Sequence, residues 1–96
     1  ISAKQGHSEH QTGLATDILT YNTGTSKFKD TKESEWLIAN AYKYGFILRY
    51  PENKTYLTGY AYEPWHYRFV GVNVAKKIYN ENLTFDEYYA YYIENK

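Results

Sequence analysis

The sequence predicts one small α+β domain, an antiparallel sheet with flanking helices. Its 96 residues suffice for a single domain. Some segments alternate apolar and polar residues, which is typical of strands, and others repeat apolar residues every three or four positions, which is typical of helices. We find no internal repeat, low-complexity tract or second domain boundary. The whole chain is therefore expected to form part of one domain.

Segments with the composition of strands lie in the first and middle parts of the chain. They are residues 14–20, 46–50, 58–62 and 65–70. In the first of them, Asp17 projects from an otherwise apolar face, so its carboxylate needs a partner. Pro51 ends the second segment, and Pro64 separates the third from the fourth. We expect these strands to be arranged around a bend.

A helix is predicted over residues 31–44, where apolar side chains recur at i, i+4 and i+7. Asp30 and Glu33 before and within its first turn have the spacing of a capping box. Gly45 follows as the residue that ends the helix.

Two short helices are predicted near the C-terminus. Gly71 opens the first, and the capping box Thr84–Glu87 opens the second. The second carries an aromatic stripe at helical spacing, made of Phe85, Tyr88, Tyr89, Tyr92 and Ile93. Core packing is the simplest interpretation of this stripe, and a partner-facing surface is the alternative.

The charge balance excludes several classes of partner. Eleven basic residues match eleven acidic ones, and the isoelectric point is near 7.0. A neutral chain without a basic cluster lacks the electrostatic footprint of a nucleic-acid binder or of a protein bound to anionic membranes. There is no cysteine, so a metal must be held by histidine and carboxylate ligands.

His10, Asp17 and His66 form a candidate set of zinc ligands. Two neutral imidazoles and one carboxylate can hold Zn²⁺ tetrahedrally and leave the fourth position for water, as in catalytic zinc sites. Residues seven apart point to opposite faces of a regular strand, so His10 and Asp17 converge only if the chain changes conformation at Gly13.

Glu63 is the candidate general base. Glu63 and His66 would lie on opposite faces of a straight strand, but Pro64 fixes a bend that lets both face one site. A carboxylate beside zinc can take a proton from water, whose pKa the metal lowers toward about 7. The reaction class is then metal-assisted hydrolysis. The alternative is structural: His10 caps a turn, Asp17 bonds a loop backbone, and His66 is a half-buried histidine.

Three segments resemble one family. Residues 8–17 read SEHQTGLATD and match the pattern S-x-H-x-x-G-x-A-x-D. Residues 59–68 read GYAYEPWHYR and match E-x-W-H with its usual flanks. The segment between them, YGFILRYP at 44–51, is similar as well. Together they resemble the VanY-type zinc D-alanyl-D-alanine carboxypeptidases of bacterial cell-wall metabolism, a group that also holds L,D-carboxypeptidases.

The resemblance implies a small zinc peptidase fold shared with Hedgehog domains, with Zn²⁺ as cofactor. His10, Asp17 and His66 would be its ligands and Glu63 its catalytic base. The resemblance further places Ser8, Gln11 and Trp65 at the substrate. That substrate would be a peptidoglycan stem peptide, from which a terminal D-Ala is released outside the membrane.

The family carries an Arg and a Gln upstream of the first motif, and the sequence given starts after that point. We therefore expect residues 1–96 to be the C-terminal part of one zinc carboxypeptidase domain, completed by an upstream portion that also supplies the signal or anchor for export. Arg49 and Arg68 match family positions after the motif and are expected to form salt bridges or packing contacts.

Other functions remain open at this stage. One is an L,D-carboxypeptidase acting on tetrapeptide stems. A second is a zinc-stabilised module that binds peptidoglycan or a protein without turnover, as Hedgehog-type domains show. A third takes the aromatic stripe near the C-terminus as a dimer interface.

Overall fold

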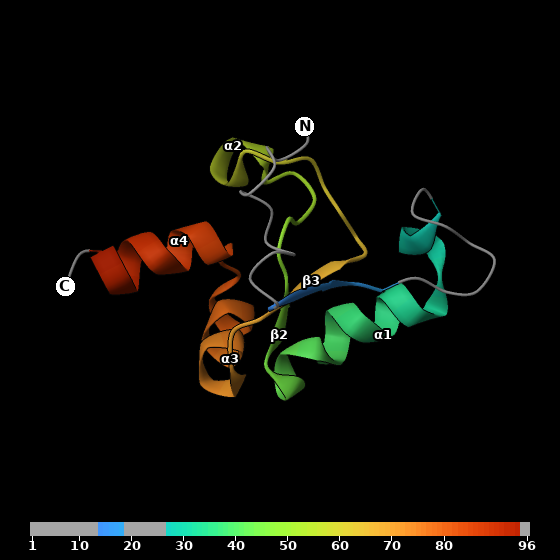
Figure 1. Ribbon diagram of the computed structural model, residues 1–96, viewed down its shortest axis with the longest axis horizontal. Coiled ribbons are helices and arrows are strands. Elements are labelled where there is room, and N and C mark those ends of the chain that lie inside the picture. Colours follow the sequence, from blue (N-terminus) through green and yellow to red (C-terminus); the bar gives the residue numbers. More distant parts are fainter. Residues whose placement is uncertain (1–13, 19–26, 95–96) are drawn as a thin grey trace.

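A computed structural model describes residues 14–18 and 27–94. Its sheet has three antiparallel strands, β1 (Ala15–Asp17), β2 (Phe46–Leu48) and β3 (His66–Phe69), in the order β1-β3-β2. The last strand in the sequence is therefore the central one (Figure 1). Asp17 pairs with His66 on one side of β3, and Phe46 pairs with Phe69 on the other. The predicted α+β class is confirmed.

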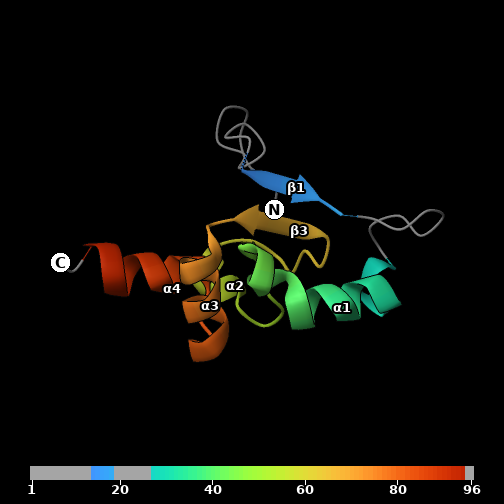
Figure 2. The ribbon, with the colours of Figure 1, turned by 90° about the horizontal axis from the view of Figure 1, so that it is seen from below.

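The helices gather on the β2 side of the sheet, and β1 forms the opposite edge (Figure 2). They are α1 (Lys32–Asn40), α2 (Thr55–Thr58), α3 (Val72–Glu81) and α4 (Phe85–Tyr89). The core joins Ile47 of β2 to Ala75 and Ile78 of α3, and all three are buried. Because β2 is tied to both β3 and α3, it connects the sheet to the helical layer.

The first helix begins one residue later than the capping-box spacing indicated. Asp30 belongs to a preceding 3-10 turn, Phe28–Asp30, and Thr31 is the N-cap. The Thr31 hydroxyl accepts from the Ser34 N–H at 3.1 Å and donates to the Phe28 carbonyl at 2.8 Å. Thr31 therefore bonds to the 3-10 turn on one side and caps α1 on the other, in place of the expected capping box of Asp30 and Glu33.

The predicted helix over 31–44 is α-helical only as far as Asn40. Residues Ala41–Tyr44 form a 3-10 turn, and Gly45 stops it with a φ of 89°. The Gly45 carbonyl then accepts the N–H groups of Val70 and Gly71 at 2.8 and 3.2 Å. The predicted glycine stop is confirmed, and it also joins the start of β2 to the end of β3.

The predicted strand over 58–62 is wrong. Thr55–Thr58 form the helical turn α2, and Gly59 ends it with a φ of 79°. Residues 58–62 read TGYAY, and tyrosine at every second position suits a strand, but none of the three described strands includes them. Short apolar runs do not by themselves distinguish a helical turn from a strand.

Both predicted C-terminal helices are present. Gly71 precedes α3, and the capping box of Thr84 and Glu87 at α4 is complete, with bonds of 2.9 and 3.0 Å. A π-helical turn, Ala90–Glu94, continues α4.

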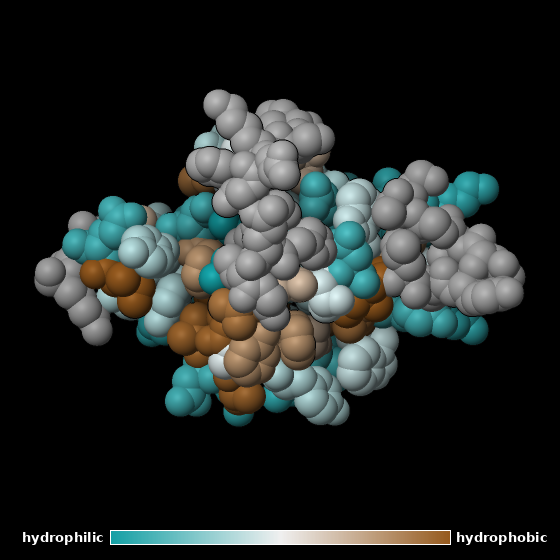
Figure 3. All heavy atoms as spheres, in the orientation of Figure 1, coloured by the Kyte–Doolittle hydropathy of each residue, from teal (hydrophilic) through white to brown (hydrophobic). Residues whose placement is uncertain are grey.

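The aromatic stripe on α4 is only partly core. Phe85 and Tyr88 pack against the core cluster, whereas Tyr89 and Ile93 are 46% and 44% exposed. Brown apolar surface is visible around α3 and the end of β3 (Figure 3), and the exposed apolar side chains of these two elements include Phe69 and Val72. None of the described helices has the length and apolar composition that a membrane span requires.

Candidate metal centre

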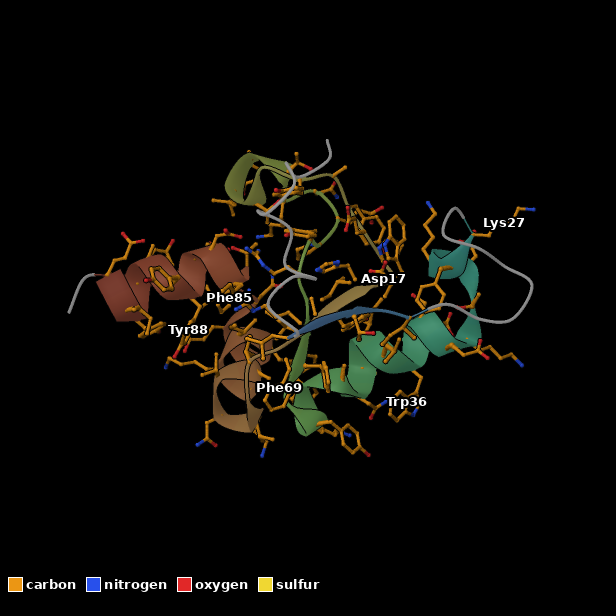
Figure 4. The ribbon with its side chains drawn as sticks, viewed as in Figure 1. Asp17, Lys27, Trp36, Phe69, Phe85 and Tyr88 are labelled. Carbon is orange, nitrogen blue, oxygen red and sulfur yellow. The ribbon has the colours of Figure 1, made fainter. Side chains whose placement is uncertain are left out.

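The pairing of β1 with β3 brings Asp17 and His66 together. They are directly opposed in the antiparallel register, and Oδ1 of Asp17 lies 3.4 Å from Nδ1 of His66. The next residue of the first strand region, Ile18, donates its N–H to the Trp65 carbonyl at 2.8 Å, which extends the pairing past the site. Figure 4 shows Asp17 near the middle of the molecule, away from Phe85 and Tyr88 on α4. The partner expected for the Asp17 carboxylate is therefore His66.

A tight turn brings Glu63 to the same imidazole. The His66 N–H donates to the Glu63 carbonyl at 3.1 Å, so residues 63–66 close a β-turn with Pro64 at its second position, where a fixed φ is favourable. The turn leaves Oε1 of Glu63 3.6 Å from Nδ1 of His66. The bend that Pro64 was expected to create is present, and Glu63 and His66 face one site.

The three side chains differ in their access to solvent. The His66 side chain is 5% exposed, while those of Glu63 and Asp17 are 25% and 43% exposed. The imidazole is therefore buried, whereas both carboxylates keep contact with solvent.

The separation of Asp17 and His66 suits a shared zinc ion. Two ligand atoms that each lie about 2.1 Å from a tetrahedral ion are about 3.4 Å apart. The Oδ1–Nδ1 distance has that value. Within the described ranges, no group of three histidine, cysteine or acidic side chains is placed to hold a metal. The third predicted ligand, His10, lies outside the described residues.

The other predicted site residues are placed only in part. Ser8 and Gln11 lie outside the described residues. Trp65 is half-buried, and its carbonyl accepts the Ile18 N–H, so its backbone helps to pair the strand segments. Arg49 forms the expected salt bridge, with Nη1 2.7 Å from Oδ2 of Asp86. Arg68 makes a packing contact, with its guanidinium 4.8 Å from the Phe85 ring centroid.

Sequence reasoning missed Tyr50. Its ring packs against the imidazole of His66, with centroids 5.0 Å apart, and its carbonyl accepts the Glu63 N–H. A tyrosine directly before Pro51 at the end of a predicted strand gives no signal of a contact across the sheet. The motifs that carry zinc ligands do not include it.

Comparison with known proteins identifies the family. The sequence profile of VanY, described as D-alanyl-D-alanine carboxypeptidase, matches residues 1–72. YodJ of Bacillus subtilis is 51% identical over 90 residues, covering 91% of this chain and 33% of YodJ. A D-alanyl-D-alanine carboxypeptidase of Enterococcus faecium is 45% identical over 91 residues, covering 95% and 29%. The chain thus spans about a third of the length of these relatives.

Solved structures agree with this match. The LdcB LD-carboxypeptidase, described for its peptidoglycan recognition, is 51% identical with a TM-score of 0.83, covering 88% of this chain and 41% of LdcB. VanYB in complex with D-Ala-D-Ala is 45% identical with a TM-score of 0.79, covering 91% and 46%. A VanY D,D-pentapeptidase variant in complex with Zn(II) is 46% identical with a TM-score of 0.73, covering 86% and 45%. The predicted zinc peptidase fold is confirmed, and the chain belongs to the VanY family of D-alanyl-D-alanine carboxypeptidases.

Proposed function

We propose that this chain carries the zinc site and general base of a carboxypeptidase that removes terminal D-Ala from peptidoglycan stem peptides. The observation that carries the proposal is the convergence of Asp17 and Glu63 on Nδ1 of His66, at 3.4 and 3.6 Å. A buried imidazole flanked by two partly exposed carboxylates provides both metal ligands and a base in one place. His10 completes the ligand set by the sequence motif.

Asp17, His66 and Glu63 have different roles in the proposed hydrolysis. When bound, zinc supplies Lewis-acid chemistry that polarises the scissile carbonyl and lowers the pKa of water. Asp17 and His66 would hold it, since their ligand atoms have the separation of two tetrahedral ligands. Glu63 would take the proton from the attacking water and deliver it to the departing amine of D-Ala. The Pro64 turn holds Glu63 beside His66, and the resemblance to the family assigns Glu63 the role of base rather than of ligand.

The relatives support the choice of substrate. One relative carries the name D-alanyl-D-alanine carboxypeptidase, and the VanYB structure holds D-Ala-D-Ala. We therefore assign this chain a stem peptide ending in D-Ala, with Ser8, Gln11 and Trp65 as contacts to it. Since stem peptides are exposed outside the membrane, we place the protein's activity there, at the cell wall.

A second candidate reaction is L,D-carboxypeptidase cleavage of tetrapeptide stems. LdcB, an LD-carboxypeptidase, is similar at 51% identity, compared with 45% for VanYB. Both reactions release D-Ala and use the same zinc chemistry. The two reactions differ in the residue before the scissile bond, so they are distinguished by supplying the pentapeptide and the tetrapeptide stems separately.

We also propose that two copies of this chain form a dimer through the C-terminal segment. Tyr89 and Ile93 of the aromatic stripe lie four residues apart on α4 and the turn that follows it, and they are 46% and 44% exposed. Such a row of apolar groups lowers its free energy by burial against another surface. Sedimentation equilibrium across a range of concentrations tests it, and a strict monomer removes it.

The deciding experiment measures D-Ala released from pentapeptide and tetrapeptide stems by mass spectrometry, with zinc content determined on the same sample. Chelator-sensitive release from the pentapeptide supports the D,D reaction, and release from the tetrapeptide alone supports the L,D reaction. Bound zinc with no release from either stem means that residues 1–96 hold the metal but need the rest of the expected domain for turnover, or that they form a zinc-stabilised binding module. Glu52→Gln, an exposed carboxylate outside the site, is the matched control for Glu63→Gln.

A further inference from the structure

The imidazole of His66 has an aromatic neighbour, the ring of Tyr50, in addition to its two polar contacts. The Tyr50 and His66 ring centroids are 5.0 Å apart with an interplanar angle of 39°. Tyr50 and His66 are 6% and 4% exposed, so water does not separate the rings. A side chain packed this closely limits the rotation of the imidazole about its χ angles.

The same residue also positions the backbone of Glu63. The Tyr50 carbonyl accepts the Glu63 N–H at 3.0 Å, at the start of the turn that leads to His66. Tyr50 therefore contacts the candidate base through its main chain and the candidate ligand through its ring. One residue fixes the relative placement of the two groups that are to act together.

Tyr50 is itself held on other sides. The Tyr60 ring lies 4.7 Å from it, centroid to centroid, and the Arg49 guanidinium lies 4.7 Å from its centroid. Arg49 donates its backbone N–H to the His66 carbonyl at 3.1 Å, and its guanidinium forms a two-point contact with Asp86, at 2.7 and 3.4 Å. The start of α4 is thus linked through Arg49 to Tyr50 and to His66.

We propose that Tyr50 is a positioning residue that holds the His66 imidazole in the orientation required for zinc binding. This inference rests on the proposed function, because it assumes that His66 is a ligand. Partners that orient a metal-bound histidine typically contribute about 10- to 100-fold to metal affinity. The contact of the Tyr50 side chain with His66 is made by its ring, so the ring is the part that the proposal concerns.

The test is the zinc affinity of the 96-residue chain, measured by competition with a chromophoric chelator. Tyr50→Leu, which removes the ring, is expected to weaken zinc binding by about 10- to 100-fold. Tyr50→Phe, which keeps the ring, is expected to bind zinc as the wild type does. Tyr56→Leu is the matched control, because Tyr56 is 80% exposed on α2. The visible spectrum of the cobalt-substituted chain should change in Tyr50→Leu alone, since it reports ligand geometry.

Each result has a defined meaning. A folded Tyr50→Leu chain with wild-type zinc affinity and cobalt spectrum overturns the positioning role and leaves the proposed function intact. A wild-type chain with no zinc affinity overturns the proposed function, and the inference falls with it. Should Tyr50→Leu fail to fold, nuclear Overhauser contacts between the Tyr50 and His66 rings in the zinc-bound wild type decide the question. Their persistence supports the role, and their loss on zinc binding contradicts it.

Discussion

Asp17 and His66 are register partners on β1 and β3, and their carboxylate and imidazole atoms approach to 3.4 Å. Because side chains alternate between the two faces of a strand, a slip of one residue would put Thr16 or Ile18 opposite His66 instead. The candidate metal centre therefore depends on the correct pairing of β1, which has three residues, with β3, which has four.

Loss of the Asp17 charge should remove most of the zinc affinity. Asp17→Asn keeps the size of the side chain and its place on β1, but an amide oxygen is a weaker ligand than a carboxylate. Mutation of residues that only hydrogen-bond to metal ligands typically lowers metal affinity about 10- to 100-fold. Loss of a ligand itself should therefore lower the zinc affinity by more than about 100-fold. Competition titration with a chelator measures it. Asp30→Asn, an exposed carboxylate outside the sheet, should bind zinc normally, and equal affinities for the two variants would contradict the assignment.

Glu63→Gln should separate zinc binding from turnover. The side chain lies beside His66 but is expected to act on water, so its amide should retain zinc and lose proton transfer. General acid–base catalysis contributes about 10²- to 10⁴-fold, and D-Ala release should fall by that factor. Zinc content and release are measured on one preparation, with Glu52→Gln as the control. Undiminished release from Glu63→Gln would show that another group is the base.

Two glycines with positive φ should respond differently to alanine. A Cβ at Gly45 would lie 2.7 Å from a ring carbon of Phe69 and 3.1 Å from the backbone of Gly71, whereas nothing lies within 4 Å of one at Gly59. Left-handed backbone costs an alanine about 1–2 kcal/mol at either position. Gly45→Ala should therefore lose clearly more stability in urea denaturation. Equal losses would mean that the junction between β2 and β3 can shift to make room.

Tyr67→Phe should stabilise the protein, most of all in alkali. Tyr67 is 1% exposed, and within the described part of the chain its hydroxyl has no hydrogen-bond partner. An unsatisfied buried hydroxyl costs on the order of 1 kcal/mol, which the variant would recover at neutral pH.

The alkaline effect of Tyr67 has a definite sign. Burial, with a smaller contribution from Tyr62, raises the pKa of Tyr67 above its usual value near 10. The folded protein keeps this proton where the unfolded chain loses it, so the free energy of unfolding declines as pH rises above about 10. Tyr67→Phe should show a smaller decline than wild type in urea titrations across this range, and the exposed-site variant Tyr56→Phe should not. Parallel declines in Tyr67→Phe and wild type would contradict the prediction.

Local sequence chemistry was sufficient to predict the turn at Glu63–His66 and the glycine stop at Gly45. Pro64 restricts its own φ and the residue before it, and Gly45 takes a φ that other residues avoid. An acidic residue on an apolar strand face also predicted that Asp17 needs a partner. These features depend on neighbours in sequence, so they are visible before the fold is known.

The sequence did not predict the features that depend on tertiary contacts. The strand predicted over 58–62 is absent, because a run of five residues with tyrosine at every second position holds too little periodicity to identify a strand. The contact of Tyr50 with His66 depends on the register of β2 against β3, which pairs Leu48 with Tyr67. No local pattern around Tyr50 contains that register, so its role became visible only in the structure.

Zinc stoichiometry in the wild type and in His66→Ala tests the central claim most directly. Metal content is measured by mass spectrometry after equilibration with zinc, and circular dichroism verifies that both chains are folded. We predict one tightly bound zinc per wild-type chain and none in His66→Ala, with the same loss in His10→Ala. Full zinc occupancy in a folded His66→Ala chain would contradict the ligand assignment on which the mechanism depends.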